Sequence, residues 1–387
     1  MSGGIVQLVA TGAQDAWLTG KPEVSFFRSN YRRYTHYASS VDRQVIQGAP
    51  IAGGISTIRF EKKGDLLNYV YLTARDGNGS MVPIVNWSNV IDKVEFMIGG
   101  QVIDTQDITY STQIEPVTGA QNYSQRLLLG NNGTNLYSNN TVAGFYPLKF
   151  FFNKDWSVSL PLVALQFHDV ELRITWSPNL AAVTNFDGSA GAANYNTLQY
   201  ICWSNFTYLD QAERDYFANT PQDLLITQVQ RTIVLGSQTM QELALAQPVK
   251  FLAFSTANYG SAYGTSGSTS SAVADFKLKT QVNGVDVGEF RELPAYVDLP
   301  QYYNTPFGYL PNGVNCGTAN VGIISYCLDT SKLQPTGTLN FSRLDTYRIV
   351  VPPTITISSL IKSTYLYAVG YNVLRIQNGL GSLLYAN

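Results

Sequence analysis

The chain has 387 residues, of which 45% are hydrophobic and only 13% are charged, with a formal net charge of −2. Its length allows two domains of ordinary size, and its charge falls short of the roughly 25% typical of soluble domains, which indicates a surface largely covered by partners or sugars. A near-neutral chain is not expected to condense nucleic acid, because that requires basic patches that neutralise phosphates.

The first distinctive segment is basic and aromatic. Residues 26–37 read FFRSNYRRYTHY, and its candidate contact residues are Phe26, Phe27, Arg28, Tyr31, Arg32 and Arg33. Such a cluster can stack bases and pair with phosphates. It can equally form an arm whose aromatic rings pack on protein while its arginines bind carboxylates and carbonyls. Because the rest of the chain carries so little charge, we favour the protein-contact arm and expect no direct contact with nucleic acid.

Short β-type runs separated by Gly, Asn, Ser and Pro dominate the first half. Residues 55–60 alternate polar and apolar side chains, and residues 66–74 are rich in Tyr, Val and Leu. Residues 94–104 read VEFMIGGQVID, which predicts two strands joined at Gly99 and Gly100. A two-residue type I′ turn needs positive φ angles, which glycine adopts readily.

Around the midpoint the pattern predicts two long strands and one helix. Residues 160–176 (LPLVALQFHDVELRITW) predict a strand that contains His168, which we interpret as a hydrogen-bonded structural histidine. Residues 200–210 (YICWSNFTYLD) predict an aromatic-rich strand. Residues 210–217 (DQAERDYF) predict a short helix with Asp210 as N-cap and Glu213 completing a capping box.

The second half repeats the first in the same order. Residues 276–287 (FKLKTQVNGVDV) form a second hairpin with its turn at Asn283 and Gly284; residues 333–351 and 364–376 repeat the two midpoint strands. The spacing of about 165–185 residues is the size of a domain. Jelly rolls and closed barrels are the usual solutions for such a unit, because they leave few free strand edges. We therefore predict an all-β protein of two tandem eight-stranded units, either closed barrels or jelly rolls, with a short linking helix.

Three stretches rich in Gly, Asn, Ser and Ala are predicted to be exposed loops: residues 119–144, 181–196 and 259–274. Asn132 and Asn139 lie in N-x-S/T sequons of the first loop and are the candidate exposed glycosylation sites. Tyr259 and Tyr263 are the obvious aromatic residues for a glycan-binding rim, which the alternative function of a receptor- or glycan-binding protein would require.

The sequence contains no motif for catalysis, metal binding or a cofactor. Its two histidines, His36 and His168, are too far apart for a zinc-protease helix, and no nucleophile elbow, phosphate-binding loop or dinucleotide-binding motif is present. The three cysteines are too few and too irregular for a disulfide framework. A carbohydrate-active β-sandwich enzyme remains an alternative, although no local pattern favours a carboxylate pair.

No apolar run reaches the roughly 18 residues of a membrane span, and no signal peptide is recognisable. We expect synthesis and folding in the cytoplasm.

Long segments along the chain closely resemble the major capsid proteins of nucleocytoplasmic large DNA viruses, particularly the algal-virus type. The segments that carry the resemblance are residues 3–35 (GGIVQLVATGAQDAWLTGKPEVSFFRSNYRRYT), 160–172, 209–218, 333–345 and 371–387. The resemblance implies a double jelly roll that forms a homotrimer of pseudo-hexagonal outline, many copies of which tile the icosahedral shell of the virion. This chain is shorter than typical family members, which puts in doubt the tall outer loops and glycans of its relatives.

The resemblance also implies a domain plan and a set of partners. The plan is an N-terminal arm over residues 1–40, a first jelly roll over 41–210, a linker helix over 211–222 and a second jelly roll over 223–387. The arm would lie at the base of the capsomer, facing minor capsid proteins or an internal viral membrane. The other expected partners are neighbouring capsomers and penton proteins.

Overall fold

The computed structural model describes residues 3–82, 84, 87–119, 145–181, 195–256, 276–306 and 321–385. The predicted glycosylation sites Asn132 and Asn139, and the two tyrosines Tyr259 and Tyr263, lie outside these residues. The chain divides into two compact units, Met1–His36 and Tyr37–Asn387. The first unit contains two five-residue helices, α1 (Gly3–Gln7) and α2 (Asp15–Thr19).

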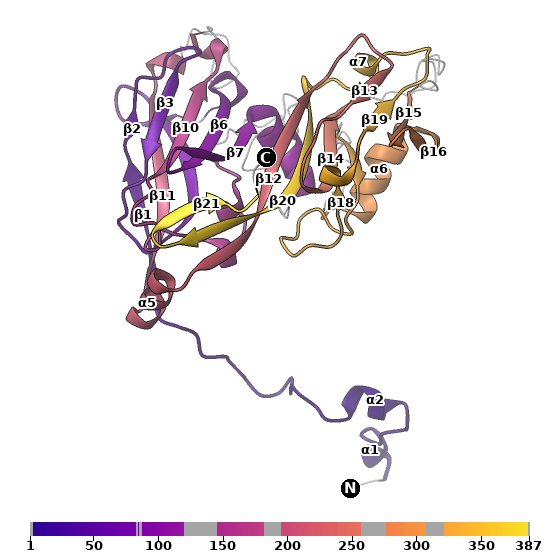
Figure 1. Cartoon of the computed structure of the whole chain (residues 1–387). Helices are drawn as coiled ribbons and strands as arrows, with labels where there is room; N and C mark the ends of the chain where they lie inside the picture. Colours follow the sequence, from indigo (N-terminus) through magenta and orange to yellow (C-terminus); the bar gives the residue numbers. More distant parts are fainter. Residues whose placement is uncertain are drawn as a thin grey trace. The chain divides into compact units, whose positions relative to one another are not determined.

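The second unit begins with a sandwich of two antiparallel sheets, which we call the first roll (Figure 1). One sheet has the order β1 (Tyr37–Gln44), β11 (Gln199–Leu209), β4 (Leu66–Arg75), β5 (Met81–Val82). Two short strands, β8 (Tyr146–Pro147) and β9 (Leu160–Pro161), also pair with β4. The other has the order β2 (Ile46–Gln47), β3 (Ile55–Arg59), β10 (Val170–Trp176), β6 (Ile91–Ile98), β7 (Gln101–Asp107).

The second roll is built in the same way. Its larger sheet has the order β12 (Gln222–Ile233), β20 (Tyr365–Gln377), β14 (Pro248–Ser255), β17 (Val321–Ser325), with β18 (Leu339–Asn340) on β14 and β21 (Leu380–Leu383) on β20. Its smaller sheet has the order β13 (Met240–Glu242), β19 (Tyr347–Val350), β15 (Lys277–Val282), β16 (Val285–Glu292).

The two rolls share one topology. The order β1-β11-β4-β8 corresponds to β12-β20-β14-β17, and the order β3-β10-β6-β7 corresponds to β13-β19-β15-β16. Each roll thus has eight principal strands in two sheets, which is the jelly-roll arrangement. The predicted all-β double jelly roll is confirmed.

Each roll buries its own hydrophobic core between its sheets. In the first roll, Phe96 packs against the consecutive rings of Phe150, Phe151 and Phe152, and the buried Trp176 donates its indole N–H to Ser56 Oγ at 2.7 Å. Alternation along the strands separates the two faces of each sheet: Leu252 and Phe254 point into the core of the second roll, whereas Phe251 and Ala253 belong to a separate cluster on the other face.

The prediction of one strand over residues 160–176 was wrong. Only Leu160–Pro161 pairs with β4; the chain then turns and crosses to the other sheet, where β10 begins at Val170. Residues 333–351 behave the same way, with β18 in one sheet and β19 in the other. Crossing lets the apolar side chains of both pieces reach the core between the sheets, which a single straight strand cannot do.

The linking helix is α5 (Gln211–Asn219), with Asp210 at its N-cap. The carboxylate of Asp210 accepts a hydrogen bond from the N–H of Gln211, and Glu213 makes no hydrogen bond back to Asp210, so the predicted capping box does not form. A second helix, α6 (Pro294–Tyr303), follows β16 and was not predicted. It buries Tyr296 and Val297 against the core of the second roll.

Candidate assembly surfaces

The two rolls are joined through the segment that follows β7. This segment is a π-helical turn, Tyr110–Ile114, continued by α3 (Glu115–Thr118). Its apolar side chains Tyr110, Ile114 and Val117 are at most 2% exposed. They pack on the outer face of the β12-β20-β14-β17 sheet, against Phe251 and Tyr367 among others. We call this contact the joint.

Buried carboxylates at the end of β7 add polar contacts to the joint. Asp104 Oδ1 accepts the N–H of Val229 at 2.9 Å, and Gln228 donates to the carbonyl of Ile103. Tyr367 donates its hydroxyl to Asp107 Oδ2 at 2.7 Å. Burial raises the pKa of Asp104 to about 6, although its hydrogen bonds to Val229 and Gln106 oppose the shift. Burial also raises the pKa of Asp107.

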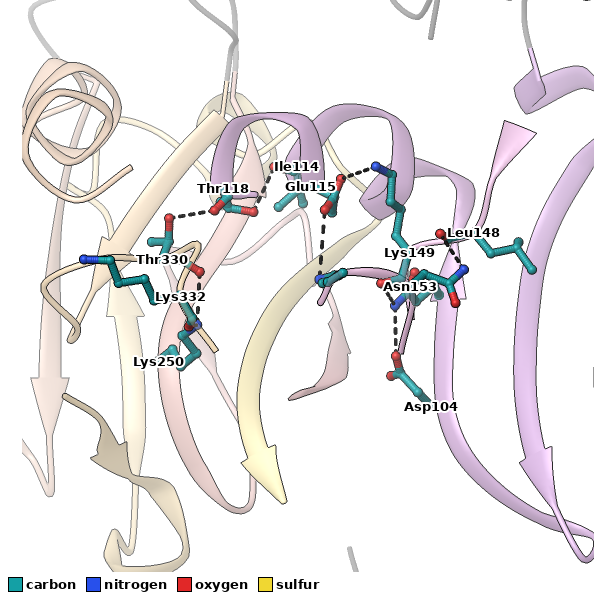
Figure 2. Close-up of polar contacts among 12 residues, drawn as sticks. Asp104, Ile114, Glu115, Thr118, Leu148, Lys149, Asn153, Lys250, Thr330 and Lys332 are labelled. Carbon is teal, nitrogen blue, oxygen red and sulfur yellow. Dashed lines mark hydrogen bonds and ion pairs between the residues drawn. The ribbon is translucent and has the colours of Figure 1, made fainter. Parts of the chain in front are cut away.

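A second polar chain holds α3 against the loop after β17 (Figure 2). Thr330 donates its hydroxyl to the carbonyl of Thr118 at 2.8 Å, and its own carbonyl accepts from Lys250 Nζ at 3.0 Å. Lys250 also donates to the carbonyl of Lys332 at 2.8 Å. The ammonium group of a buried lysine thus fixes the loop that contacts the first roll.

The last hairpin, β20–β21, returns to the first roll. His168 Nδ1 lies 3.0 Å from the carbonyl oxygen of Gly381, and the N–H of Phe167 donates to the carbonyl of Gly379 at 3.0 Å. Leu374 and Ile376 of β20 are part of the core of the first roll. His168 is therefore a structural contact between the rolls.

The outer face of the β1-β11-β4-β5 sheet of the first roll carries an aromatic pocket of about 640 Å³. Tyr69 and Tyr71 of β4 and Trp203 of β11 line it, with Phe145 beside β8. The rings are in contact: Tyr71 and Phe145 meet edge to face at 5.8 Å, and Tyr69 meets Trp156 at 6.1 Å. Tyr69 and Trp156 are exposed. An exposed aromatic concavity of this kind is typical of an interaction site.

The second roll exposes its outermost strand and helix. Every residue of β16 is exposed, including Val285 and Val287. On α6, Leu299, Tyr302 and Tyr303 are 45%, 79% and 72% exposed. In Figure 1, β16 and α6 lie on the side of the second roll away from the first.

The arm residues form an exposed segment. Phe26 and Phe27 are 92% and 98% exposed, and Tyr31 is 83% exposed. Arg28, Arg32 and Arg33 are exposed as well. Within the described part of Met1–His36 there are no buried residues, so its aromatic side chains contribute nothing to a core of their own.

The four predicted turn residues lie between paired strands. Gly99 (φ 56°) and Gly100 (φ 82°) connect β6 to β7, and Asn283 (φ 49°) and Gly284 (φ 79°) connect β15 to β16. Gly99 is also constrained by space, because a Cβ there would lie 2.6 Å from His168 Nδ1. Asn283 Oδ1 accepts the N–H groups of Asp345 at 3.0 Å and Thr346 at 3.1 Å, which ties the second hairpin to the segment before β19.

In the described residues, no group of three or more His, Cys, Asp or Glu side chains is placed to hold a metal ion. No helix among them is both long and apolar enough to cross a membrane.

The chain is similar along its whole length to known capsid proteins. It is 32% identical to the major capsid protein of Paramecium bursaria Chlorella virus 1 and 30% identical to that of Pyramimonas orientalis virus, and both matches cover 100% of each chain. A family model described as the N-terminus of the major capsid protein matches residues 25–210. The chain belongs to the major capsid protein family of large DNA viruses.

Solved structures of similar proteins have the same fold. The crystal structure of the PBCV-1 protein VP54 matches with a TM-score of 0.71 and 27% identity over 94% of this chain and 100% of that chain. The Faustovirus major capsid protein, at 11% identity and a TM-score of 0.59 over 95% of each chain, shares the fold. Members of the family are structural proteins of the virion and not enzymes, which confirms the sequence-based assignment of a structural capsid protein.

The sequence analysis missed two surface features, the aromatic pocket and the exposed end of α6. The aromatic face of the pocket was predictable from the sequence. In β4, the alternation of Val70, Leu72 and Ala74 with Tyr69 and Tyr71 marks a core face and an aromatic outer face. The exposed aromatic end of α6 could not be predicted, because the helix itself was not predicted.

Proposed function

We propose that three copies of the chain form a pseudo-hexagonal capsomer, and that many such capsomers tile the faces of an icosahedral shell. The observation that carries the proposal is the shared topology of the two rolls. Two similar rolls in each of three copies supply six similar units, so an object with three-fold symmetry acquires a nearly six-fold outline. A single protein can then occupy a hexagonal lattice.

The exposed surfaces of the rolls support association. Among the described residues, β16 is the last strand of its sheet, and all its residues are exposed, Val285, Val287 and Phe290 included. Exposed strand edges and apolar patches are common sites of association. An obligate interface of a few thousand Å² contributes tens of kcal/mol before the costs of association, at about 25 cal/mol per Å². Contacts between capsomers are expected to be smaller and more polar, so that assembly errors can be corrected.

For the remaining partners we propose the plan drawn from the resemblance. Residues 1–40 serve as an arm at the base of the capsomer, residues 41–210 and 223–387 as the two jelly rolls, and residues 211–222 as the linker. The arm contacts minor capsid proteins or the internal membrane, and penton proteins close the vertices. Exposed aromatic side chains such as Phe26 and Phe27 support a contact role for the arm. Assembly takes place in the host cytoplasm.

The native mass of the purified protein tests the proposal. Three copies of the 42.6 kDa chain have a mass of about 128 kDa, which light scattering distinguishes readily from a monomer. A trimer that persists at low concentration, followed by hexagonal arrays in electron micrographs, is the expected result. A chain that remains monomeric at all concentrations would contradict the proposed capsomer.

A further inference from the structure

We propose that the aromatic pocket of the first roll is the seat for α6 of a second copy of this chain. The proposal rests on the trimeric capsomer proposed above and names the surfaces through which neighbouring copies meet. It commits to Leu299, Tyr302 and Tyr303 of one copy as the inserted side chains. The receiving face comprises Tyr69, Tyr71 and Trp203 of the next.

The joint within one chain provides the pattern. In the first roll, the strand β7 is followed after two residues by the helical segment 110–118. That segment packs its apolar side chains on the outer face of the β12-β20-β14-β17 sheet of the second roll. One roll therefore already recognises the outer sheet face of another by means of the helical segment after its smaller sheet.

The second roll repeats the inserting element. Its strand β16 corresponds to β7, and α6 begins at Pro294, with one residue between it and the end of β16. In the segment 110–118, the side chains of Tyr110, Ile114 and Val117 are buried in the joint and at most 2% exposed. In α6, by contrast, Leu299, Tyr302 and Tyr303 are between 45% and 79% exposed. The helix α6 thus buries one side, with Tyr296 and Val297, in its own roll and leaves these three side chains exposed on the other.

The first roll repeats the receiving face. Its sheet β1-β11-β4-β8 corresponds to β12-β20-β14-β17. In the joint, Ala253 of β14 and Tyr367 of β20 are paired neighbours on the covered face. At the corresponding place in the first roll, Tyr71 of β4 and Trp203 of β11 are paired neighbours and line the pocket.

The occupant must come from another copy. Figure 1 shows α6 on the side of the second roll away from the first, so it does not reach the β1-β11-β4 sheet of its own chain. A contact between two different surfaces is heterologous, and it forms a closed ring when the rotation it imposes closes. Three contacts within chains and three between chains would complete a ring of six rolls. Aromatic side chains in an aromatic-lined pocket are the residues that dominate such interfaces.

Charge substitutions on α6 provide the first test. The double variant Tyr302→Glu, Tyr303→Glu should lower the native mass from about 128 kDa to that of the 42.6 kDa monomer. Both side chains are largely exposed, so the variant should keep the unfolding transition of the monomer. The matched control is Tyr216→Glu on α5, an exposed helical tyrosine outside both surfaces, which should remain trimeric.

Cross-linking identifies the partner surface directly. A chain carrying Tyr302→Cys is mixed, dissociated and reassociated with a chain carrying Tyr69→Cys, and intermolecular disulfides are read on a non-reducing gel. Cys316, which lies outside the described residues, is replaced by Ser in both chains, and the buried Cys202 and Cys327 should not react. A heterodimeric band from the mixture, absent from either variant alone, is expected. If the wild type is a trimer, the double glutamate variant has the same native mass and the cysteine mixture gives no such band, the proposed surface is wrong and the proposed capsomer stands. A wild-type monomer would overturn the capsomer itself.

Discussion

Asn283 combines a backbone and a side-chain role at one turn of the second roll. Its φ angle of 49° is rare for residues other than glycine, its N–H donates to the carbonyl of Thr346 at 2.8 Å, and its side chain accepts from Asp345 and Thr346. Asparagine tolerates this conformation better than most residues, because its short side chain hydrogen-bonds locally.

The variant Asn283→Pro should therefore prevent capsomer assembly. Proline fixes φ near −65° and removes the N–H, and the expected loss of unfolding free energy is about 3 kcal/mol or more. Asn283→Gly is the control, because it keeps the backbone conformation and loses only the side-chain hydrogen bonds, at about 1–2 kcal/mol. Urea unfolding and native mass measure both effects. A normal yield of trimer from the proline variant would show that the turn assignment is wrong.

Asp104 is expected to make the stability of the joint depend on pH. Its pKa is raised to about 6 in the folded chain, above the ordinary value of 3.8, so the folded state binds the proton more tightly than the unfolded state does. The stabilising contribution is complete below the unfolded pKa and is lost as the pH rises through the folded pKa. Compared with Asp104→Asn, the wild-type chain should gain about 2 kcal/mol of unfolding free energy between pH 7 and pH 4.

The exposed Asp286 serves as the control for this pH dependence. Hydrogen bonds from Lys279 and Gln281 lower its pKa, so its stabilising contribution is present above the unfolded pKa and is lost as the pH falls through the folded pKa. Relative to Asp286→Asn, the wild-type chain should thus change in the opposite direction. Chemical unfolding at a series of pH values gives both differences. A difference between the wild type and Asp104→Asn that does not vary with pH would exclude the role of Asp104.

At the scale of elements, local chemistry made the hairpins predictable. Gly99-Gly100 and Asn283-Gly284 are residues that adopt positive φ, so the turns followed from the residues themselves. The crossing between β9 and β10 was missed because it depends on which sheet each piece joins, and pairing with β4 is a long-range property. The helix α6 was missed because Pro300 and its tyrosines are poor helix formers, and burial of Tyr296 and Val297 overrides that preference. The pocket unites β4, β5 and β11, whose proximity only the fold determines.

The arm is an element whose loss should separate assembly from attachment. Deletion of residues 1–30 should leave the trimer intact, because the side chains described within Met1–His36 are all exposed. The fraction of protein that co-sediments with virus particles should fall. Two double variants of the full chain distinguish an apolar contact from an ionic one. A loss of co-sedimentation in Phe26→Ser, Phe27→Ser indicates an apolar contact, and a loss in Arg32→Gln, Arg33→Gln indicates an ionic one. If the truncated chain fails to trimerise, the arm does not lie at the base of the capsomer.

At the scale of the whole molecule, a duplicated roll explains how so weakly charged a chain is suited to a shell. Only 13% of its residues are charged, and the aromatic pocket and the exposed side chains Leu299, Tyr302 and Tyr303 of α6 are apolar surfaces that need a partner. The joint is one such surface already covered within a single chain. Similar rolls allow one mode of contact to be used both within a chain and between chains.

The return of β20–β21 to the first roll has a consequence for the order of events during synthesis. His168 contacts Gly381, 213 residues later in the sequence, and Leu374 and Ile376 complete the hydrophobic core of the first roll. The ribosome makes all strands of the first roll early, yet that roll lacks part of its interior until the last hairpin has emerged from the exit tunnel. We therefore expect nascent chains to complete the first roll only when translation is nearly finished, so that finished assembly surfaces are not exposed on incomplete polypeptides.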